Sequence, residues 1–481
     1  MAEAEFEDQR LNDRLTSVLS ALGERPQASI PAACGGWAET TAAYRLFDND
    51  RVSPEKILRP HFRRSVRRAA DHPVVLLVQD TTELDLTRPT QQVRGAGPLD
   101  APSRRGALVH PVLAFTPDGT PLGCVSASIW TRPDPEAAES REQKQRRRRI
   151  TPIEGKESYR WLEGLRAARE AAQQLPGTTC VCIADSEADI YELFAEERGA
   201  VPVHWLIRAA QDRRVEAPAA AEGSGPEGAT RLIREAVSAS PVLFSNEISI
   251  RGRDRTIACK TGSRERPRAG RKARVDVRAA RFRLRPPRPG LPSVSVHVVL
   301  VREAAPPPDD VAVEWLLITT LPIDDLESVR RIVGHYATRF MIEVFFRVLK
   351  SGCRVEERRF GHIDRLLPCV AVYLIVAWRT LMVCRLGRSS PEMDCEAIFE
   401  PAEWKSVWAV TRGESPPETP PALGTMIRLV AQLGGYVNRP GRKDPPGPQT
   451  VWLGLQRARD LAWAWITFGP GATRPLEKNS V

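Results

Sequence analysis

Four residues at fixed spacing, Tyr336, Arg339, Glu343 and Lys350, lie in an apolar stretch that contains no glycine or proline. At about 100° per residue, a continuous helix would place them within an arc of roughly 60°. The rest of that helix surface is apolar, which predicts burial in a core. One carboxylate among cations suits a site for a polyanion, where the cations grip phosphate. The alternative is an internal salt-bridge ladder of Glu343 with Arg339 and Arg347.

Two further carboxylates follow apolar, β-branched runs that are typical of buried central strands: Asp80 after residues 73–79, and Asp185 after residues 179–184. If these strands are neighbours, Asp80, Asp185 and Glu343 converge. Carboxylates that close cannot all stay ionised unless cations bind. Mg²⁺ suits such oxygen ligands, and Mn²⁺ could substitute for it. A pair of these ions can activate a water or a 3′-hydroxyl for in-line attack on a phosphodiester.

The alternative for Asp185 is an ordinary helix N-cap, since a helix is expected to begin directly after it. Capping explains Asp80 less well, because the Thr-Thr-Glu-Leu-Asp sequence that follows it is not helical.

The charge balance favours a nucleic-acid partner. The chain has 481 residues, 70 Lys and Arg against 60 Asp and Glu, and a net charge of +10. An excess of Arg over Lys also fits a GC-rich coding bias. Nine Cys without a CxxC pair and seven His argue against a zinc site and indicate reduced thiols. The acidic N-terminus is unlike a signal peptide, and no run of 18 apolar residues predicts a membrane span.

Strands that alternate with helices predict an α/β fold with at least one large core. We expect N-terminal helices over 1–70, the first part of the core over 71–210, an antiparallel β insertion over 211–310, the final strand and Glu343 helix over 311–368, and a helical domain over 369–481. The apolar residues 369–384 are expected to form a core helix.

Three basic segments accompany these elements. Arg63, Arg64, Arg67 and Arg68 cluster on a helix expected to start at Ser53, and 141–149 is a polar, Arg-rich segment. The third segment, 264–288, lies in the β insertion. Each could contact phosphate, or could be a solvated face or linker.

The spacing Tyr336-x2-Arg339-x3-Glu343-x6-Lys350 resembles the Y-(2)-R-(3)-E-(6)-K signature of DDE transposases of insertion sequence family four. The segments LLVQDTTELDL and CIADSEADIYEL resemble the first and second Asp blocks of that family. WAETTAAYRLFDNDRVSPEKIL resembles its N-terminal region, and the segment from Met426 to Trp465 its C-terminal region. Ser186 departs from the family, which often has Arg there, as does the pair Phe340-Met341, where an aromatic and a basic residue are common.

The resemblance implies an RNase H-like catalytic core in which Asp80, Asp185 and Glu343 hold metal ions. It implies cut-and-paste transposition of double-stranded DNA through a hairpin intermediate. Tyr336, Arg339 and Lys350 would bind phosphates near the cut, with Arg347 extending the same stripe.

Trp315 matches a family aromatic residue that can stack on a flipped base. Its alternative is an ordinary core Trp on a strand.

The resemblance also implies a homodimer on two paired element ends, joined through the C-terminal helical lobe. A cytoplasmic, nucleoid-associated bacterial protein without a membrane partner is expected. Two other functions stay open at this point: a catalytically silent relic that binds DNA, and a nuclease or resolvase that cleaves without joining.

Overall fold

The computed structural model of the chain describes residues 6–90, 92–101, 103–134, 140–216, 230–250, 252, 257–258, 264–265, 269–308, 310–437 and 445–470. The helices are α1 (Gln9–Glu24), α2 (Ile30–Cys34), α3 (Trp37–Phe47), α4 (Pro54–Ala69), α5 (Arg141–Ile150), α6 (Arg160–Gln173), α7 (Tyr191–Ala195), α8 (Ile233–Ser238), α9 (Leu326–Thr338), α10 (Phe340–Arg347), α11 (Ile363–Ser389), α12 (Pro401–Arg412), α13 (Leu423–Leu433) and α14 (Pro448–Phe468). The strands are β1 (Val74–Gln79), β2 (Thr82–Asp85), β3 (Gly97–Pro98), β4 (Arg105–Phe115), β5 (Pro121–Trp130), β6 (Thr179–Ala184), β7 (His204–Arg208), β8 (Arg214–Glu216), β9 (Thr230–Leu232), β10 (Phe244–Ile250), β11 (Ile257–Ala258), β12 (Arg264–Glu265), β13 (Arg271–Leu284), β14 (Val294–Glu303) and β15 (Glu314–Thr319).

A large mixed sheet organises the fold. Its 13 strands follow the order β2-β4-β1-β6-β7-β15-β14-β13-β8-β9, with β3 and β5 beside β4 and β10 beside β13. The pairs β1–β6 and β6–β7 are parallel, and the other pairs of this sheet are antiparallel. The α/β expectation is confirmed at this level: the protein has a mostly antiparallel sheet with flanking helices.

Strand β1 shows why these residues form a central strand. Alternate side chains of a strand point to opposite faces. Accordingly, Leu76 and Val78 enter the core on the face of α10 and α11, whereas Val75 and Leu77 enter the core on the face of α6. Because both faces are covered, the run has no polar alternation.

The β4–β5 hairpin turns at Asp118 and Gly119, as the sequence predicts. Thr116 N donates to Thr120 O at 3.0 Å, and Gly119 has a φ of 86°, which favours glycine.

The 211–310 segment forms no separate sheet in its described part, apart from the β11–β12 pair. Strands β8, β9, β10, β13 and β14 pair antiparallel and extend the main sheet beyond β15. Part of the basic 264–288 segment is the strand β13. Its Arg side chains are largely matched by acids, for example Arg271 with Glu303 at 2.9 Å and Arg281 with Asp324 at 2.6 Å. Residues 217–229, 253–256, 259–263 and 266–268 of the insertion lie outside the described residues. The domain boundaries stay predictions.

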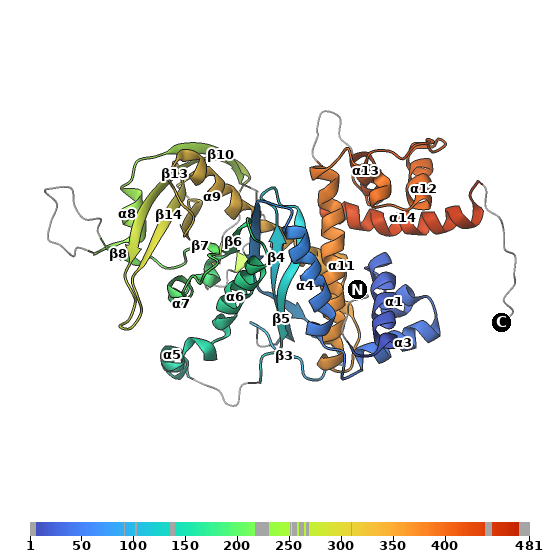
Figure 1. Cartoon of the computed structure of the whole chain (residues 1–481), viewed down its shortest axis with the longest axis horizontal. Helices are drawn as coiled ribbons and strands as arrows, with labels where there is room; N and C mark the ends of the chain where they lie inside the picture. The colour runs from blue at the N-terminus through green and yellow to red at the C-terminus, as the bar shows by residue number, and fades with distance from the viewer. Residues whose placement is uncertain are drawn as a thin grey trace.

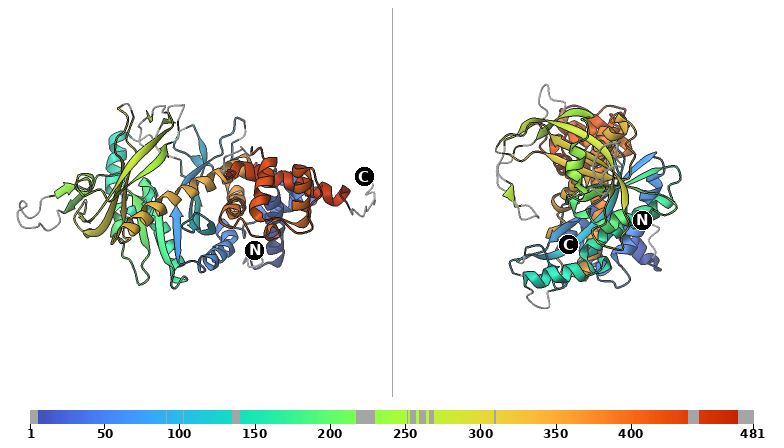
Figure 2. Two further views of the ribbon diagram at one scale, coloured as in Figure 1. Left: turned by 90° about the horizontal axis from the view of Figure 1, so that it is seen from above. Right: turned by 90° about the vertical axis from the view of Figure 1, so that its left-hand side faces the viewer.

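The terminal helices gather at one end of the elongated molecule, away from β8, β13 and β14 (Figure 1). Helix α11 crosses the centre, between the sheet and α12–α14. The view from above shows the same sequence of parts along the long axis (Figure 2).

Helix α11 is longer than the sequence stretch that pointed to it. It has 27 residues and is the one described helix long and apolar enough to cross a membrane, yet 78% of its most apolar window is buried inside the protein. It packs against α4, β5 and α13 as a core helix, as expected.

The expectation of one continuous, fully buried helix from Tyr336 to Lys350 is wrong. The chain breaks at Arg339 into α9 and α10, because Arg339 N bonds to Tyr336 O and Ile342 N bonds to Arg339 O, both at 3.1 Å and with tighter i+3 spacing. Residues Val348–Gly352 then widen into a π-helical turn. As a result Phe340 is 54% exposed, whereas Ile342, Phe345 and Phe346 are buried.

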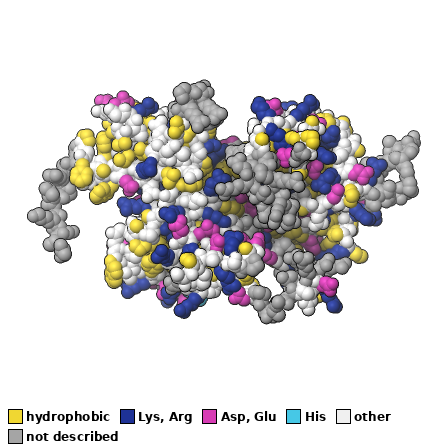
Figure 3. Space-filling model, turned by 180° about the vertical axis from the view of Figure 1, so that it is seen from behind, with side chains coloured by type: hydrophobic (Ala, Val, Ile, Leu, Met, Phe, Trp, Pro, Cys, Tyr) yellow, Lys and Arg dark blue, Asp and Glu magenta, His cyan; other side chains and the backbone are white. Residues whose placement is uncertain are grey.

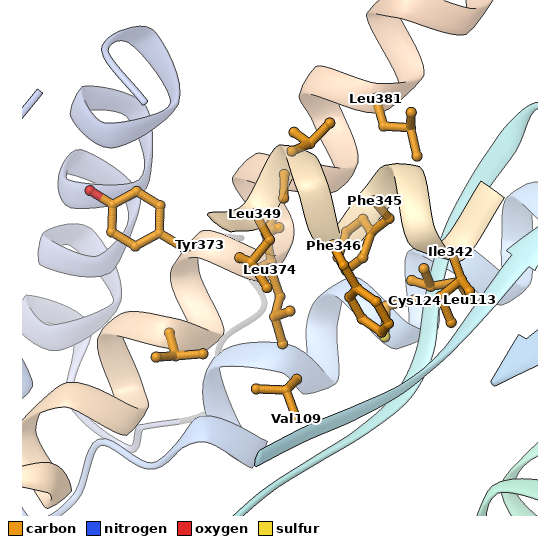
Figure 4. Packing of buried hydrophobic residues seen from close by; sticks show 14 of the residues in the cluster. Val109, Leu113, Cys124, Ile342, Phe345, Phe346, Leu349, Tyr373, Leu374 and Leu381 are labelled. Carbon is orange, nitrogen blue, oxygen red and sulfur yellow. The ribbon is translucent and has the colours of Figure 1, made fainter. Parts of the chain in front are cut away.

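The buried side of α10 attaches it to the sheet. Figure 4 shows Ile342 and Phe346 directed toward Leu113 of β4 and Cys124 of β5, with these side chains from distant parts of the chain in one cluster. The packing of these apolar residues therefore fixes the side of α10 from which Glu343 projects.

Two smaller expectations also change. The Arg-rich 141–149 segment is itself helical, as α5, and begins with a capping box at Ser140. The helix expected directly after Asp185 is a 3₁₀ turn, Ser186–Ala188, followed by the five-residue α7.

Candidate functional site

Asp80 and Asp185 occupy equivalent places at the carboxyl edge of the sheet. Strands β1 and β6 are parallel neighbours with Val78 opposite Ile183. Asp80 and Asp185 each follow the last residue of their strand. The two strands are therefore neighbours, as the predicted convergence of Asp80 and Asp185 requires.

The immediate partners of the two carboxylates differ. Asp80 is 5% exposed, and its Oδ1 accepts a hydrogen bond of 2.7 Å from Thr81 N. Asp185 is half-buried, and its Oδ1 accepts from Glu187 N at 2.8 Å. Asp185 therefore also has the capping role that was the alternative reading, at the start of a 3₁₀ turn.

Glu343 reaches the same edge from α10. Its side chain is 44% exposed, and its Oε1 lies 3.6 Å from Arg339 Nη2. The Arg339 half of the suggested salt-bridge ladder is thus present. No Arg347–Glu343 pair occurs among the ion pairs of the described residues.

The pKa of Asp80 depends on both of the other acids. Burial raises the pKa of Asp80 to about 7, aided by the charges of Asp185 and Glu343, while Arg339 acts in the opposite direction. The pairing of β1 with β6 places Asp185 beside Asp80, and Arg339 contacts both Asp80 and Glu343. The three acids and Arg339 therefore form one charged group.

Arg339 is the cation of this group. Its Nη1 donates to Asp80 Oδ2 at 2.9 Å, and its side chain is only 16% exposed. It stands between the sheet and α10, at the break between the two helices. Its positive charge offsets part of the mutual repulsion of the three acids.

The donor chemistry of the three acids suits a metal ion. Three carboxylates supply the hard oxygen ligands that Mg²⁺ or Mn²⁺ prefers. Burial, and then the charge of Asp185, raises the pKa of Asp80, and a bound cation would favour its ionised form. In the described part of the chain, no three acidic, His or Cys side chains already stand close enough together to coordinate an ion. The donor set fits, but Arg339 would have to release Asp80 Oδ2.

Tyr336 and Trp315 lie beside the acids. Tyr336 is 5% exposed, and its ring meets that of Trp315 edge to face, with centroids 5.2 Å apart. Burial raises the pKa of Tyr336, and Asp185 acts in the same direction. Trp315 is half-buried near the start of β15, which runs antiparallel to β7 with Leu317 opposite Arg208. This end of β15 is therefore at the same sheet edge as both Asp residues.

Lys350 and Arg347 extend away from the acids. The Lys350 Nζ lies 3.8 Å from Glu356 Oε1. Burial lowers the pKa of Lys350, and Glu83 is among the acids that oppose this effect. The π-helical turn begins after Arg347, and Lys350 faces β2. The charged side chains therefore do not lie along the one straight stripe expected for a continuous helix. Arg347 is exposed.

Sequence reasoning missed Arg208 and Arg160. Arg208 is the last residue of β7, the third parallel strand, so its place after an apolar strand was a usable signal. It lies close enough to lower the pKa of Tyr336. Arg160 begins α6, lies over the ring of Trp130 at 5.7 Å, and interacts electrostatically with Asp80. No spacing rule pointed to Arg160.

One cavity of the described residues lies elsewhere. It has a volume of about 890 Å³ between the loop after α3 and the start of α11, with Asp48, Arg94, His362 and Arg365 among its lining residues. Asp80, Asp185 and Glu343 are not part of its lining.

Two family models match this chain. Residues 1–52 match a model described as transposase DNA-binding, and residues 375–462 match the transposase Tn5 dimerisation domain. A solved structure, a piggyBac transposase synaptic complex with hairpin DNA, is similar at a TM-score of 0.36 and 10% identity, over 92% of this chain and 79% of that chain. That likeness is too low to carry an argument. The family matches at the two ends support a DNA transposase that binds DNA and dimerises.

Proposed function

We propose that this protein is a DDE transposase of insertion sequence family four that cuts the ends of a mobile element through a hairpin intermediate and joins them to target DNA. One arrangement carries the proposal: Asp80 and Asp185 directly follow the paired parallel strands β1 and β6, and Arg339 contacts both Asp80 and Glu343. Asp80, Asp185 and Glu343 are the three acids that the resemblance selects. The matches at both chain ends add DNA binding and dimerisation.

The catalytic core proposed here is RNase H-like. It comprises β1, β4 and β5, which are antiparallel, and β6 and β7, which are parallel to β1. Asp80, Asp185 and Glu343 would hold Mg²⁺, or Mn²⁺ in its place. When bound, two such ions supply the positive charge that activates a water or a 3′-hydroxyl and stabilises the leaving oxygen.

The other residues of the edge have roles that follow from their charge. Arg339, whose Nη1 contacts Asp80, would be available to bind a DNA phosphate if Asp80 held a metal ion. Tyr336 donates its hydroxyl to a phosphate oxygen, and Arg208 adds a further cation at the end of β7. Trp315 offers a partly exposed ring on which an extruded base stacks.

Lys350 and Arg347 act farther along the DNA. Both belong to the stretch from α10 into the π-helical turn, with Lys350 beside Glu356. We propose that both side chains bind phosphates of the DNA backbone outside the reacting pair of nucleotides. Like Arg339, they carry only hydrogen-bond donors, which suits phosphate oxygens.

Charge on the surface is dispersed. Figure 3 shows Lys and Arg side chains spread over one face of the molecule and interspersed with Asp and Glu. Binding therefore depends on local phosphate contacts near the sheet edge and the N-terminal helices, and the net charge of +10 adds general attraction. The protein is proposed to act in the bacterial cytoplasm, associated with the nucleoid, as a homodimer on paired element ends.

The test is an assay of supercoiled plasmid that carries the cognate element ends, incubated with Mg²⁺. A transposase nicks the ends, forms hairpins and yields strand-transfer products. Cleavage without joined products would indicate a nuclease or resolvase instead. Specific DNA binding with no cleavage in either Mg²⁺ or Mn²⁺ would indicate a silent relic.

A further inference from the structure

A chain of side-chain hydrogen bonds runs through the core directly behind Asp80. Arg160 Nε lies 2.8 Å from Thr81 Oγ1, and Thr81 Oγ1 lies 2.8 Å from His110 Nδ1. His110 Nε2 lies 3.0 Å from Gln79 Oε1, and Gln79 Nε2 lies 3.3 Å from the backbone oxygen of Trp161. His110 is 3% exposed and Gln79 is fully buried. Few buried polar groups are arranged in line without a structural or functional reason.

Each bond in this chain has one consistent direction. Arg160 has only donors, so the Thr81 oxygen accepts and its hydrogen is free for His110 Nδ1. His110 is then neutral, carries its proton on Nε2 and donates to Gln79 Oε1. The amide nitrogen of Gln79 is thereby left to donate to Trp161 O and to Cys182 Sγ at 3.2 Å. A change at His110 interrupts the series in its middle.

Two members of this hydrogen-bonded series flank Asp80: Gln79, the last residue of β1, and Thr81. Gln79 and Thr81 point to the α6 face of the sheet, whereas Asp80 points to the opposite face, where Arg339 binds it. Thr81 also donates its backbone N–H to Asp80 Oδ1. Because both neighbours are held from behind, the direction of the Asp80 carboxylate depends on how firmly they are held.

Close packing shows that the network has little freedom. A Cβ on Gly164 of α6 would come within 2.0 Å of Gln79 Oε1 and 3.4 Å of His110 Nε2. The Trp161 ring meets the His110 ring edge to face, with centroids 4.8 Å apart. The absence of a side chain at Gly164 lets α6 approach the hydrogen-bonded groups.

We infer that His110 is a positioning residue, which fixes Gln79 and Thr81 and so directs the Asp80 carboxylate toward the place where a divalent cation binds. The inference rests on the proposed function, in which Asp80 is a metal ligand. Groups that orient a ligand from behind commonly change metal affinity by about 10–100-fold when they are removed.

The experiment compares His110→Phe with Trp161→Phe in the full-length protein. His110→Phe removes both hydrogen bonds of the ring, whereas Trp161→Phe disturbs the packing on His110 and keeps the Trp161 backbone oxygen in the chain. Mn²⁺ affinity is measured by calorimetry, with the protein alone and with an uncleavable element-end DNA. We expect His110→Phe to weaken Mn²⁺ binding about tenfold or more, and Trp161→Phe to change it less than about twofold.

Two further variants separate positioning from stability. In His110→Phe the Thr81 hydroxyl still accepts from Arg160 Nε, but its hydrogen has lost its acceptor. Adding Thr81→Val removes that hydroxyl, and Mn²⁺ affinity should stay low in the double variant whatever its thermal stability. Gly164→Ala displaces Gln79 without changing a residue of the network, and it should also weaken Mn²⁺ binding. It serves as the test of the positioning role if His110→Phe does not fold.

The outcomes are distinct. A folded His110→Phe protein with wild-type Mn²⁺ affinity overturns the positioning role, as does a wild-type protein that binds no Mn²⁺ in either condition. Weakened Mn²⁺ binding in His110→Phe, together with a wild-type protein that never cleaves element ends, overturns the transposase proposal and leaves the positioning role intact.

Discussion

Arg339 holds Asp80 by a hydrogen bond of 2.9 Å between Nη1 and Oδ2, at the point where the helix from Leu326 breaks before Phe340. The cation comes from the same short segment as Glu343, and it occupies an oxygen that a metal ion would need. Metal binding and release of Arg339 are therefore expected to be linked. The four predictions that follow depend on this relationship or on the dimer.

Neutral variants of the three acids should lose catalysis. We expect Asp80→Asn, Asp185→Asn and Glu343→Gln to abolish nicking of element ends in Mg²⁺, because each removes a proposed metal ligand, while gel-shift affinity for the ends survives. Asp71→Asn is the matched control, since Asp71 is exposed and lies just before the amino end of β1. Wild-type nicking by any of the three would remove that residue from the metal site.

The raised pKa of Asp80 predicts a pH-dependent stability. Because the folded pKa of about 7 lies above the usual pKa of a carboxyl group, the folded state binds this proton more tightly than the unfolded state does, and the contribution to stability is lost as the pH rises from about 4 to about 7. Asp185, Glu343 and Arg339 face the group. Without metal, the stability difference between Asp80→Asn and wild type should therefore shift in favour of the variant, by about 2–4 kcal/mol, as the pH rises from about 4 to about 8.

Urea unfolding in chelator at pH 4, 6 and 8 measures this difference. A gap between Asp80→Asn and wild type that does not vary with pH would contradict the raised pKa. Mg²⁺ at pH 8 should stabilise wild type more than the variant, because the ion binds the ionised carboxylate.

The Arg339–Asp80 pair should show strong coupling. Arg339→Ala leaves Asp80 buried without its cation, so we expect a loss of about 2–3 kcal/mol at pH 8 without metal. In Asp80→Asn the same change should cost less, since Arg339 then interacts with Glu343 and Asp185 but not with a charge at residue 80. A double-mutant cycle by urea unfolding gives the coupling energy. Equal costs in both backgrounds would show that the pair contributes nothing to the fold.

The end of α14 should contribute to dimerisation. Trp463 and Ile466 are 64% and 65% exposed, three residues apart on one side of the helix, next to the region that matches a dimerisation domain. Trp463→Ser with Ile466→Ser should weaken self-association on element-end DNA at least tenfold, measured by sedimentation equilibrium. Val311→Ser, at a residue 84% exposed near β15, is the control. An unchanged dimer would place the interface on another surface.

Local patterns in the sequence were sufficient for several parts of this protein. Apolar runs without alternation identified β1 and β6 as central strands, and Asp80 and Asp185 stood out because each directly follows one of them. The fixed spacing around Glu343 selected the third acid, and Ser53 with Pro54 gave the correct start of α4. These features depend on neighbouring residues alone, so the sequence by itself determined them.

Only the tertiary structure decided how these parts meet. The pairing of β1 with β6 joins residues about a hundred positions apart, and no local rule fixes it. Packing of Ile342 and Phe346 on the sheet set the face of α10, while the break at Arg339 and the wider turn at Lys350 redirected charges that a regular helix would have aligned. The links from Arg160 to His110 and from Arg339 to Asp80 arose because burial forces distant polar groups to find partners, which depends on the whole fold.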